Sequence, residues 1–245
     1  MIKKVIIITK VSIIIPFYNC SYVDQAIDSA INQTYDNIEV IVVNDGSTRF
    51  TEKIIPYLNR IRYIEKGNGG TASALNLGIK NATGDYFSWL SSDDIFYKDK
   101  IAKQLNFMKE RNGSFSYTNY SFINKDSQIT KSAAGVYFPN RIDFLQHLRT
   151  GNSINGCTVM MKMELFSKLG VFNEGLKFTQ DYDFWLRAVQ HYEFYYLNEP
   201  LLKYRVHNDM GTKKHYEDIM KEVRTLNQKY EDQLINLINI ENSKK

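Results

Sequence analysis

The chain has 245 residues, enough for one large domain or two small ones, and its 43% apolar and 24% charged residues are ordinary for a globular protein. A net charge of +4 is too small to predict a nucleic-acid-binding protein, which concentrates Lys and Arg on one face. This charge is compatible with an anionic small substrate and equally with an anionic membrane surface. The two cysteines, Cys20 and Cys157, lie far apart without CxxC spacing, so we expect reduced thiols in a cytoplasmic protein.

The first half of the chain alternates predicted strands and helices. Short β-branched and apolar runs bounded by turn residues predict strands at 11–15, 39–43, 61–64 and 86–90. Apolar residues at helical spacing predict helices at 22–32, 51–58 and 71–81, the second of them interrupted at Pro56. This alternation predicts a doubly wound, mostly parallel sheet, in which ligands bind beyond the carboxyl ends of the strands.

The second half is less regular. Helices are predicted at 95–110, 142–149, 163–169 and 182–191, and strands at 115–119, 158–162, 194–197 and 201–206. Residues 124–132 read as a polar hairpin or loop, and residues 215–240 as an amphipathic C-terminal helix. That helix could dock on the domain, pair with a second subunit as a homodimer, or touch a membrane; its mixed polar face argues against a basic membrane anchor.

Two adjacent carboxylates, Asp93 and Asp94, end the strand predicted at 86–90. Side by side at the end of an apolar strand, they repel each other and lose solvation. A divalent cation relieves both costs, and Mg²⁺ commonly bridges one or two carboxylates to substrate phosphates. Asn19 and Asp45 also follow strand ends, so these polar residues predict a metal-assisted diphosphate site at one edge of the sheet.

An ordered set of motifs covering roughly residues 11 to 207 resembles the family 2 glycosyltransferases, which have the nucleotide-sugar-binding α/β fold called GT-A. It is particularly similar to the spore-coat polysaccharide type within that family. The motifs are Ser12-Ile-Ile-Ile-Pro-Phe-Tyr-Asn19, Gln33-Thr-Tyr35, Glu39-Val-Ile-Val-Val-Asn-Asp-Gly-Ser47, Asn68-Gly69, Asn76-Leu-Gly78, Gly84-Asp85 with Ser92-Asp-Asp94, and Gln180-Asp-Tyr-Asp-Phe-Trp-Leu-Arg187.

The resemblance implies a division of roles among these residues. Asp45 accepts the N3–H of uracil or thymine, Asp93 binds the ribose, and Asp94 holds Mn²⁺ or Mg²⁺ against the diphosphate. His207 either completes the metal shell or is an ordinary surface or core histidine. The residues expected to bind the nucleotide are Pro16, Phe17, Tyr18, Asn19, Asp45, Asn68, Gly69, Asn76, Ser92 and Asp93.

The catalytic base of the family falls on Asp181. A carboxylate can deprotonate a hydroxyl acceptor if proton transfer is concerted with attack at the anomeric carbon. Asp183, two residues on, is read as a charge that favours the start of a helix. Arg205, Lys213 and Lys214 are read either as cations of a lid over the diphosphate or as solvated charges.

Three positions depart from the family pattern. Ser91 replaces an acid two residues before Asp93, which leaves the metal affinity open. Gln180 replaces an acid before Asp181, which leaves the acceptor preference open. Leu75 replaces an arginine that many members carry near the donor.

The resemblance implies an inverting, metal-dependent glycosyltransferase that moves a hexose-type sugar from a UDP-sugar, or a dTDP-sugar, to a hydroxyl acceptor. The acceptor would be a saccharide or a lipid-linked or protein-linked glycan in polysaccharide or cell-surface glycan synthesis. Residues 1–95 would bind the nucleotide, 96–212 the acceptor, and 213–245 would form the C-terminal helix and tail. The alternative is a nucleotide-sugar-binding protein whose catalysis is impaired.

The residues that follow the first strand exclude two other enzyme classes. A Rossmann-type oxidoreductase needs G-x-G-x-x-G there, and a nucleotidyltransferase needs a glycine-rich loop with a cation; residues 16–19 are Pro-Phe-Tyr-Asn instead. No apolar stretch approaches the length of a membrane span, and the apolar run before Thr9 and Lys10 is too short for a signal peptide. We therefore expect a cytoplasmic protein, with contact at the inner face of the membrane left open.

Overall fold

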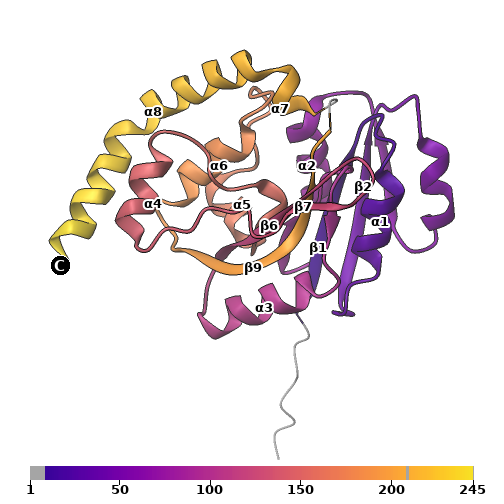
Figure 1. Cartoon of the computed structure of the whole chain (residues 1–245), viewed down its shortest axis with the longest axis horizontal. Coiled ribbons are helices and arrows are strands. Elements are labelled where there is room, and N and C mark those ends of the chain that lie inside the picture. Colours follow the sequence, from indigo (N-terminus) through magenta and orange to yellow (C-terminus); the bar gives the residue numbers. More distant parts are fainter. Residues whose placement is uncertain (1–8, 208–209, 245) are drawn as a thin grey trace, which may run out of the picture.

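The structure is a computed structural model that describes residues 9–207 and 210–244. A single nine-stranded sheet runs through the molecule, with helices packed along it (Figure 1). The strands are β1 (Val11–Phe17), β2 (Ile38–Asp45), β3 (Arg62–Lys66), β4 (Tyr86–Trp89), β5 (Ile95–Phe96), β6 (Phe115–Ile123), β7 (Ile129–Lys131), β8 (Met160–Lys162) and β9 (Phe194–Arg205). The helices are α1 (Val23–Ile31), α2 (Gly70–Asn81), α3 (Lys100–Glu110), α4 (Arg141–Leu148), α5 (Glu164–Leu169), α6 (Gln180–Ala188), α7 (Gly211–Lys214) and α8 (Tyr216–Ser243), with 3₁₀ turns η1 (Thr51–Tyr57) and η2 (Gly156–Thr158).

The first half forms the parallel part of the sheet, in the order β3-β2-β1-β4. β1 lies in its centre, and Ile13, Ile14 and Ile15 are all fully buried. A strand covered on both faces needs such a continuous apolar run. The helices α1 and α2 both pack against β1 and β2. Because β1 is parallel to its neighbours β2 and β4, the strand ends followed by Asn19, Asp45 and Asp93 come together at one edge.

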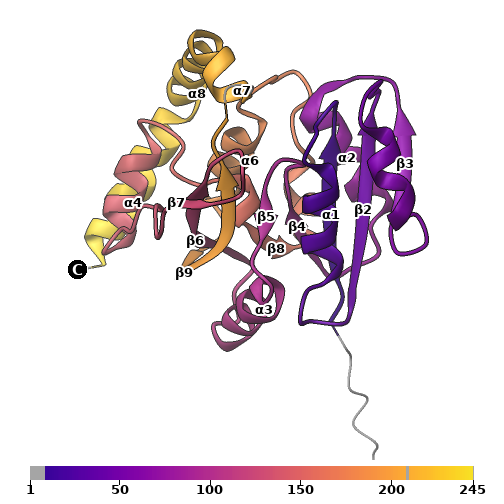
Figure 2. The ribbon, with the colours of Figure 1, turned by 45° about the vertical axis from the view of Figure 1, so that its right-hand side comes forward.

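The second half makes the sheet mixed. β8 is antiparallel to both β4 and β6, β6 and β9 are parallel, and β5 closes the edge antiparallel to β9 (Figure 2). The predicted fold, a mixed and mostly parallel sheet flanked by helices, is confirmed. The polar segment after β6 forms a hairpin through β7.

Three predicted elements differ in the structure. The helix predicted from residue 95 begins at Lys100, because Ile95 and Phe96 pair with β9 as a strand. The two strands predicted at 194–197 and 201–206 are one strand, β9, whose register against β6 shifts at Thr118 and Asn119. The segment with Pro56 is a 3₁₀ helix, as suits a residue that has no N–H to donate.

The C-terminal helix α8 docks on the domain, where it packs against α4 and α6 (Figure 1). Its buried residues recur every three or four positions, which is the spacing of a single helix face. They belong to the same core cluster as the central strands and are Val223, Leu226, Tyr230, Leu234 and Ile238. Among the described helices, none is both long enough and apolar enough to cross a membrane.

The close packing of α2 on β1 gives a prediction at Gly78. A Cβ there would lie 2.4 Å from Cγ2 of the buried Ile14, so a methyl group must force the strand and helix apart. In an exposed helix, Gly→Ala stabilises by about 1 kcal/mol; here we expect Gly78→Ala to destabilise the fold by about 1 kcal/mol or more, because overpacking costs about 1–3 kcal/mol. Urea unfolding measures this. The control Gly151→Ala, where a Cβ meets nothing within 4 Å, should leave the free energy of unfolding unchanged or raised; the same result for Gly78→Ala would contradict the prediction.

Candidate functional site

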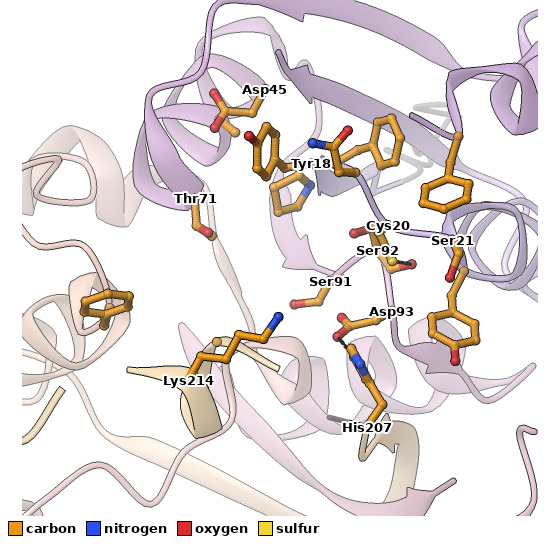
Figure 3. A pocket seen from close by; sticks show the side chains of 18 of the residues that line it. Tyr18, Cys20, Ser21, Asp45, Thr71, Ser91, Ser92, Asp93, His207 and Lys214 are labelled. Atoms are coloured by element: carbon orange, nitrogen blue, oxygen red, sulfur yellow. Dashed lines mark hydrogen bonds and ion pairs between the residues drawn. The ribbon is translucent and has the colours of Figure 1, made fainter. Parts of the chain in front are cut away.

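A cavity of about 1070 Å³ opens at the carboxyl ends of β1, β2 and β4. Figure 3 shows Asp45 at one end of it and Asp93 with His207 at the other. The sheet side is formed by residues 16–22, Asp45, Trp89 and residues 91–93. The opposite wall is formed by Lys177, Phe178, Gln180, His207, Gly211, Lys214, His215 and Ile219. Of the residues predicted to bind a nucleotide, the structure brings seven to this cavity: Pro16, Phe17, Tyr18, Asn19, Asp45, Ser92 and Asp93.

Asp45 is 3% exposed and holds the turn that leads into α2. Its Oδ1 accepts hydrogen bonds from the Gly69 N–H at 2.9 Å and from Lys66 Nζ at 2.6 Å. Its Oδ2 accepts from the Gly70 N–H at 2.8 Å and from Asn68 Nδ2 at 3.2 Å. A carboxylate has about four acceptor sites, so all of them are in use, and a base N–H would have to displace or share one donor. Asn68 and Gly69 contact Asp45 and are not part of the cavity lining.

Asn19 links the end of β1 to the loop after β2. Its side-chain Oδ1 accepts from the backbone N–H groups of Thr48 and Arg49, both at 2.9 Å, and its own N–H donates to Ser47 Oγ. It adopts a φ of 48°, in the left-handed region that asparagine tolerates better than most residues. The turn places Tyr18 over the cavity with 54% of its surface exposed.

Asn76 lies elsewhere, contrary to the predicted nucleotide contact. Its Nδ2 donates to the Phe172 carbonyl and to Glu174 Oε1, both at 2.9 Å, and its Oδ1 accepts from the Phe172 N–H at 3.0 Å. The amide is therefore saturated by the 172–174 loop and fastens that loop to α2. The structure does not place it in the cavity lining.

The carboxylates of Asp93 and Asp94 lie in different surroundings. Asp93 faces the cavity, and its Oδ2 is 3.0 Å from His207 Nε2. Asp94 is 1% exposed, lies outside the cavity lining, and accepts the Arg205 N–H on Oδ1 at 2.9 Å. Burial, and then the charge of Asp93, raise the pKa of Asp94 well above its usual range. In the described part of the chain, no group of three His, Cys, Asp or Glu residues could hold a metal by itself.

Arg205 is fully buried, so both of its predicted roles, lid cation and solvated charge, are wrong. Its Nε donates to the Asp93 carbonyl at 2.7 Å and its Nη2 to Gln25 Oε1 at 2.7 Å. Its Nη1 donates to the Asn124 carbonyl and to Ser127 Oγ, and the guanidinium lies 4.1 Å from the centre of the Tyr22 ring. Lys214 does line the cavity, whereas the side chain of Lys213 lies outside the described residues.

Asp181 lies in the first turn of α6, beside the cavity-lining Gln180. Its Oδ1 accepts the Tyr182 N–H at 2.7 Å, and its Oδ2 accepts from Asn152 Nδ2 at 3.0 Å. Desolvation raises the pKa of the Asp181 carboxyl to about 6, against these two hydrogen bonds, which lower it. A carboxyl that titrates near neutral pH is suited to proton transfer.

Asp183 points away from this site. It is buried and pairs with Arg187 Nε at 3.0 Å, and it accepts from the Tyr230 hydroxyl at 3.0 Å. It therefore ties α8 to α6, a structural role more specific than the helix-start charge that was predicted.

Several residues of this region escaped the sequence analysis. Asn152 and Glu222 contact the segment around Asp181 from loops or helices distant in sequence, and only the fold reveals them. Arg49, Lys125 and Lys177 add positive charge to the cavity, but as single surface cations they carry no sequence signal.

Comparison with known proteins agrees with this architecture. The model of glycosyl transferase family 2 matches residues 12–170. An uncharacterised glycosyltransferase of Rickettsia typhi is 43% identical over 208 residues, which are 82% of this chain and 65% of the relative. A putative teichuronic acid biosynthesis glycosyltransferase of Bacillus subtilis, TuaG, is 34% identical over 81% of this chain and 80% of the relative. The chain thus belongs to glycosyl transferase family 2 and has the GT-A fold. It spans 31% to 65% of the length of five Rickettsia relatives.

Solved structures show the same fold. Residues 1–349 of Staphylococcus aureus TarS, in complex with UDP-GlcNAc, superpose with a TM-score of 0.69 at 19% identity, over 94% of this chain and 72% of that one. A mannosyltransferase of Pyrobaculum calidifontis, in complex with GDP-Man and Mn²⁺, gives a TM-score of 0.63 at 21% identity, over 82% of this chain and 58% of that one. At such low identity these likenesses support the fold alone.

The buried guanidinium gives a second prediction. Arg205→Gln leaves the Asp93 and Asn124 carbonyls without their donor and creates a cavity, so we expect a loss of about 3 kcal/mol or more in the free energy of unfolding. Arg205→Lys should recover less than half of that loss, because an ammonium cannot reproduce the planar fork of donors. Urea unfolding tests both, with Lys131→Gln on the exposed strand β7 as control. A loss below about 1 kcal/mol, the usual range of a surface substitution, would contradict the prediction.

Proposed function

We propose that this glycosyltransferase moves a sugar from a UDP-sugar, or a dTDP-sugar, to a hydroxyl group of a glycan acceptor, with a divalent metal and with inversion at the anomeric carbon. One observation carries the proposal: a single cavity joins Asp45, the Asp93–His207 pair and Gln180, and Asp181 follows Gln180 in the first turn of α6. These are the groups needed to hold a nucleoside diphosphate at one side and an acceptor at the other.

The nucleotide would lie along the sheet side of the cavity. Pro16, Phe17 and Tyr18 offer an apolar and aromatic surface to a base, and Asp45 offers only acceptor oxygens. An acceptor-only group favours the N3–H of uracil or thymine over cytosine, whose N3 is itself an acceptor. Since four donors already surround Asp45, we propose that the Lys66 ammonium, a flexible donor, gives way to the base.

The metal site fits Asp93 with His207 better than Asp94 with His207. Asp93 Oδ2 and His207 Nε2 are 3.0 Å apart at the cavity, whereas Asp94 is buried against the Arg205 N–H. One carboxylate and one imidazole leave room for oxygens of the diphosphate, the usual arrangement for Mg²⁺ and acceptable to Mn²⁺. When bound, the metal would act as a Lewis acid on the departing diphosphate. A protein of the same fold, the Pyrobaculum mannosyltransferase, is in complex with GDP-Man and Mn²⁺, which supports a divalent metal here without favouring either carboxylate.

Asp181 would be the base. Its carboxylate is held by the Tyr182 N–H and Asn152 Nδ2, so its position is fixed, and its raised pKa makes it a better proton acceptor than an exposed aspartate. Attack by the deprotonating hydroxyl, opposite the departing diphosphate, inverts the anomeric configuration. The buried Oε1 of Gln180 accepts no hydrogen bond within the described part of the chain, which leaves it available to an acceptor hydroxyl.

The acceptor class rests on the relatives. TuaG is named for teichuronic acid biosynthesis, and a saccharide acceptor in cell-surface polysaccharide synthesis is the corresponding proposal for this chain.

Thermal-shift screening of UDP-, dTDP- and GDP-sugars with Mn²⁺, followed by assay of nucleoside diphosphate release with saccharide acceptors, tests the whole proposal. Stabilisation without release would favour the catalytically impaired binding protein, and GDP-sugar preference would overturn the role of Asp45.

The metal assignment predicts different outcomes for two neighbouring carboxylates. Asp93→Asn should weaken Mn²⁺ binding to the UDP-bound protein by about 100-fold, since it removes a charged ligand, and His207→Ala by about tenfold. Asp94→Asn should change it less than about threefold, because Asp94 is buried outside the cavity lining and the amide oxygen can still accept the Arg205 N–H. Titration of free Mn²⁺ by electron paramagnetic resonance measures this. The reverse order of effects would return the metal to Asp94.

Replacement of Asp181 gives a prediction for rate, pH and stability. Asp181→Asn should lower turnover by about 10² to 10⁴-fold with donor affinity unchanged, and wild-type kcat should rise with pH through an apparent pKa of about 6. The folded-state pKa lies above the ordinary value, so the charge destabilises the fold above about pH 6. Asp181→Asn should therefore raise Tm at pH 7 and not at pH 4. The control Asp183→Asn breaks the Arg187 pair and should lower Tm; normal turnover in Asp181→Asn would refute the assigned base.

A further inference from the structure

We infer that Glu222 of α8 is a positioning residue: it holds residues 177–179, the segment that leads into Asp181 and forms one wall of the cavity. The C-terminal helix is therefore part of the active site. This inference rests on the proposed role of Asp181 and extends it to a side chain forty-one positions away in sequence. Figure 1 shows α8 running across α6, the helix whose first turn contains Asp181.

The carboxylate of Glu222 gathers the segment that precedes α6. Its Oε1 accepts the Lys177 N–H at 3.0 Å, and its Oε2 accepts the Phe178 N–H at 3.1 Å and the Thr179 N–H at 3.0 Å. Its Oε2 also accepts the Thr179 hydroxyl at 2.7 Å. Three consecutive backbone donors and one hydroxyl thus converge on a single side chain.

This convergence replaces the local cap that α6 lacks. Thr179 stands at the N-cap position, where its hydroxyl would ordinarily accept from the first turn, yet it makes no such bond and donates to Glu222 instead. A negative charge next to a helix N-terminus is also favoured by the helix dipole. The path of residues 177–179 is therefore set from α8 and not by its own sequence.

Two further hydrogen bonds hold α6 on the other side of Asp181. The Tyr182 hydroxyl donates to the Leu148 carbonyl at 2.5 Å and lies 2.7 Å from the side-chain amide of Asn227 on α8, and the Tyr230 hydroxyl donates to Asp183 Oδ1 at 3.0 Å. Together with Glu222, these contacts fix the residues before and after Asp181 to one helix. They act on neighbours of Asp181 and leave its own carboxylate oxygens to Tyr182 and Asn152.

The same segment is a wall of the cavity. Lys177, Phe178 and Gln180 line it, and the Phe178 ring stacks on His215 with a centroid distance of 4.7 Å. A shift of this segment would move the wall and the start of α6 together. A displacement of 1 Å at a reacting group can lower a rate by about 100-fold, so the expected readout is catalytic.

The test compares two α8 glutamates changed in the same way. Glu222→Gln keeps the size of the side chain and removes the acceptor charge; Glu217→Gln is the matched control, since Glu217 is exposed one turn or so earlier. We expect Glu222→Gln to lower kcat by about tenfold or more and to change UDP affinity less than about twofold, because Asp45 and Asp93 lie on the opposite side. Hydrogen exchange of the amides of residues 177–179 should accelerate by about tenfold.

A second variant keeps the inference testable if Glu222→Gln does not fold. Tyr230→Phe removes one hydroxyl and should lower kcat by about threefold, with an altered apparent pKa in the kcat–pH profile, because α6 shifts around Asp181. Glu217→Gln should match the wild type in kcat, pH profile and exchange. These results together support a positioning role.

The outcomes separate this inference from the proposed function. If Glu222→Gln accelerates amide exchange at 177–179 and leaves kcat and its pH profile unchanged, Glu222 is a structural tie alone and the inference is overturned. If Asp181→Asn retains turnover, the base assignment fails, whatever exchange shows at 177–179. Loss of turnover in Asp181→Asn together with reduced kcat in Glu222→Gln supports both.

Discussion

The site depends first on a cation that never touches solvent. Arg205, at the end of β9, donates to the Asp93 carbonyl, to α1 through Gln25, and to the hairpin after β6 through Asn124. A buried guanidinium is costly unless its donors are satisfied, and here every arm of the fork finds an acceptor. Because those acceptors belong to segments far apart in sequence, the conformation of the Asp93–Asp94 turn is settled only when both halves of the sheet have met.

Environment then differentiates the acidic residues. Asp45 is saturated by four donors, Asp93 faces the cavity beside an imidazole, Asp94 is buried with its pKa raised, and Asp181 titrates near pH 6 because desolvation outweighs two hydrogen bonds. The residue type is the same in each case. What separates base recognition, metal binding and proton transfer, in the function we propose, is how far each carboxylate has been removed from water and what faces it.

The parallel half of the fold and the family could be predicted from the sequence, because buried strands such as β1 and turns such as residues 44–47 are local patterns. Sequence reasoning misplaced the start of α3, because Ile95 and Phe96 are fixed by pairing with β9. At the site it singled out Asp45, Asp93, Asp181 and His207, but it could not see that Asn76 is bound by the 172–174 loop or that Arg205 is buried. Those contacts are made with partners between 78 and 180 residues away in sequence, so no local periodicity predicts them.

The order of synthesis gives α8 a particular place in assembly. The sheet strands around β1 and the nucleotide side of the cavity emerge from the ribosome before α8, and domains generally fold as they emerge. The acceptor-side wall cannot be fastened in the same way, since Glu222, Asn227 and Tyr230 follow everything they hold. A nascent chain would thus acquire a surface for the nucleotide before it acquires the α8 contacts that hold the segment of the proposed base.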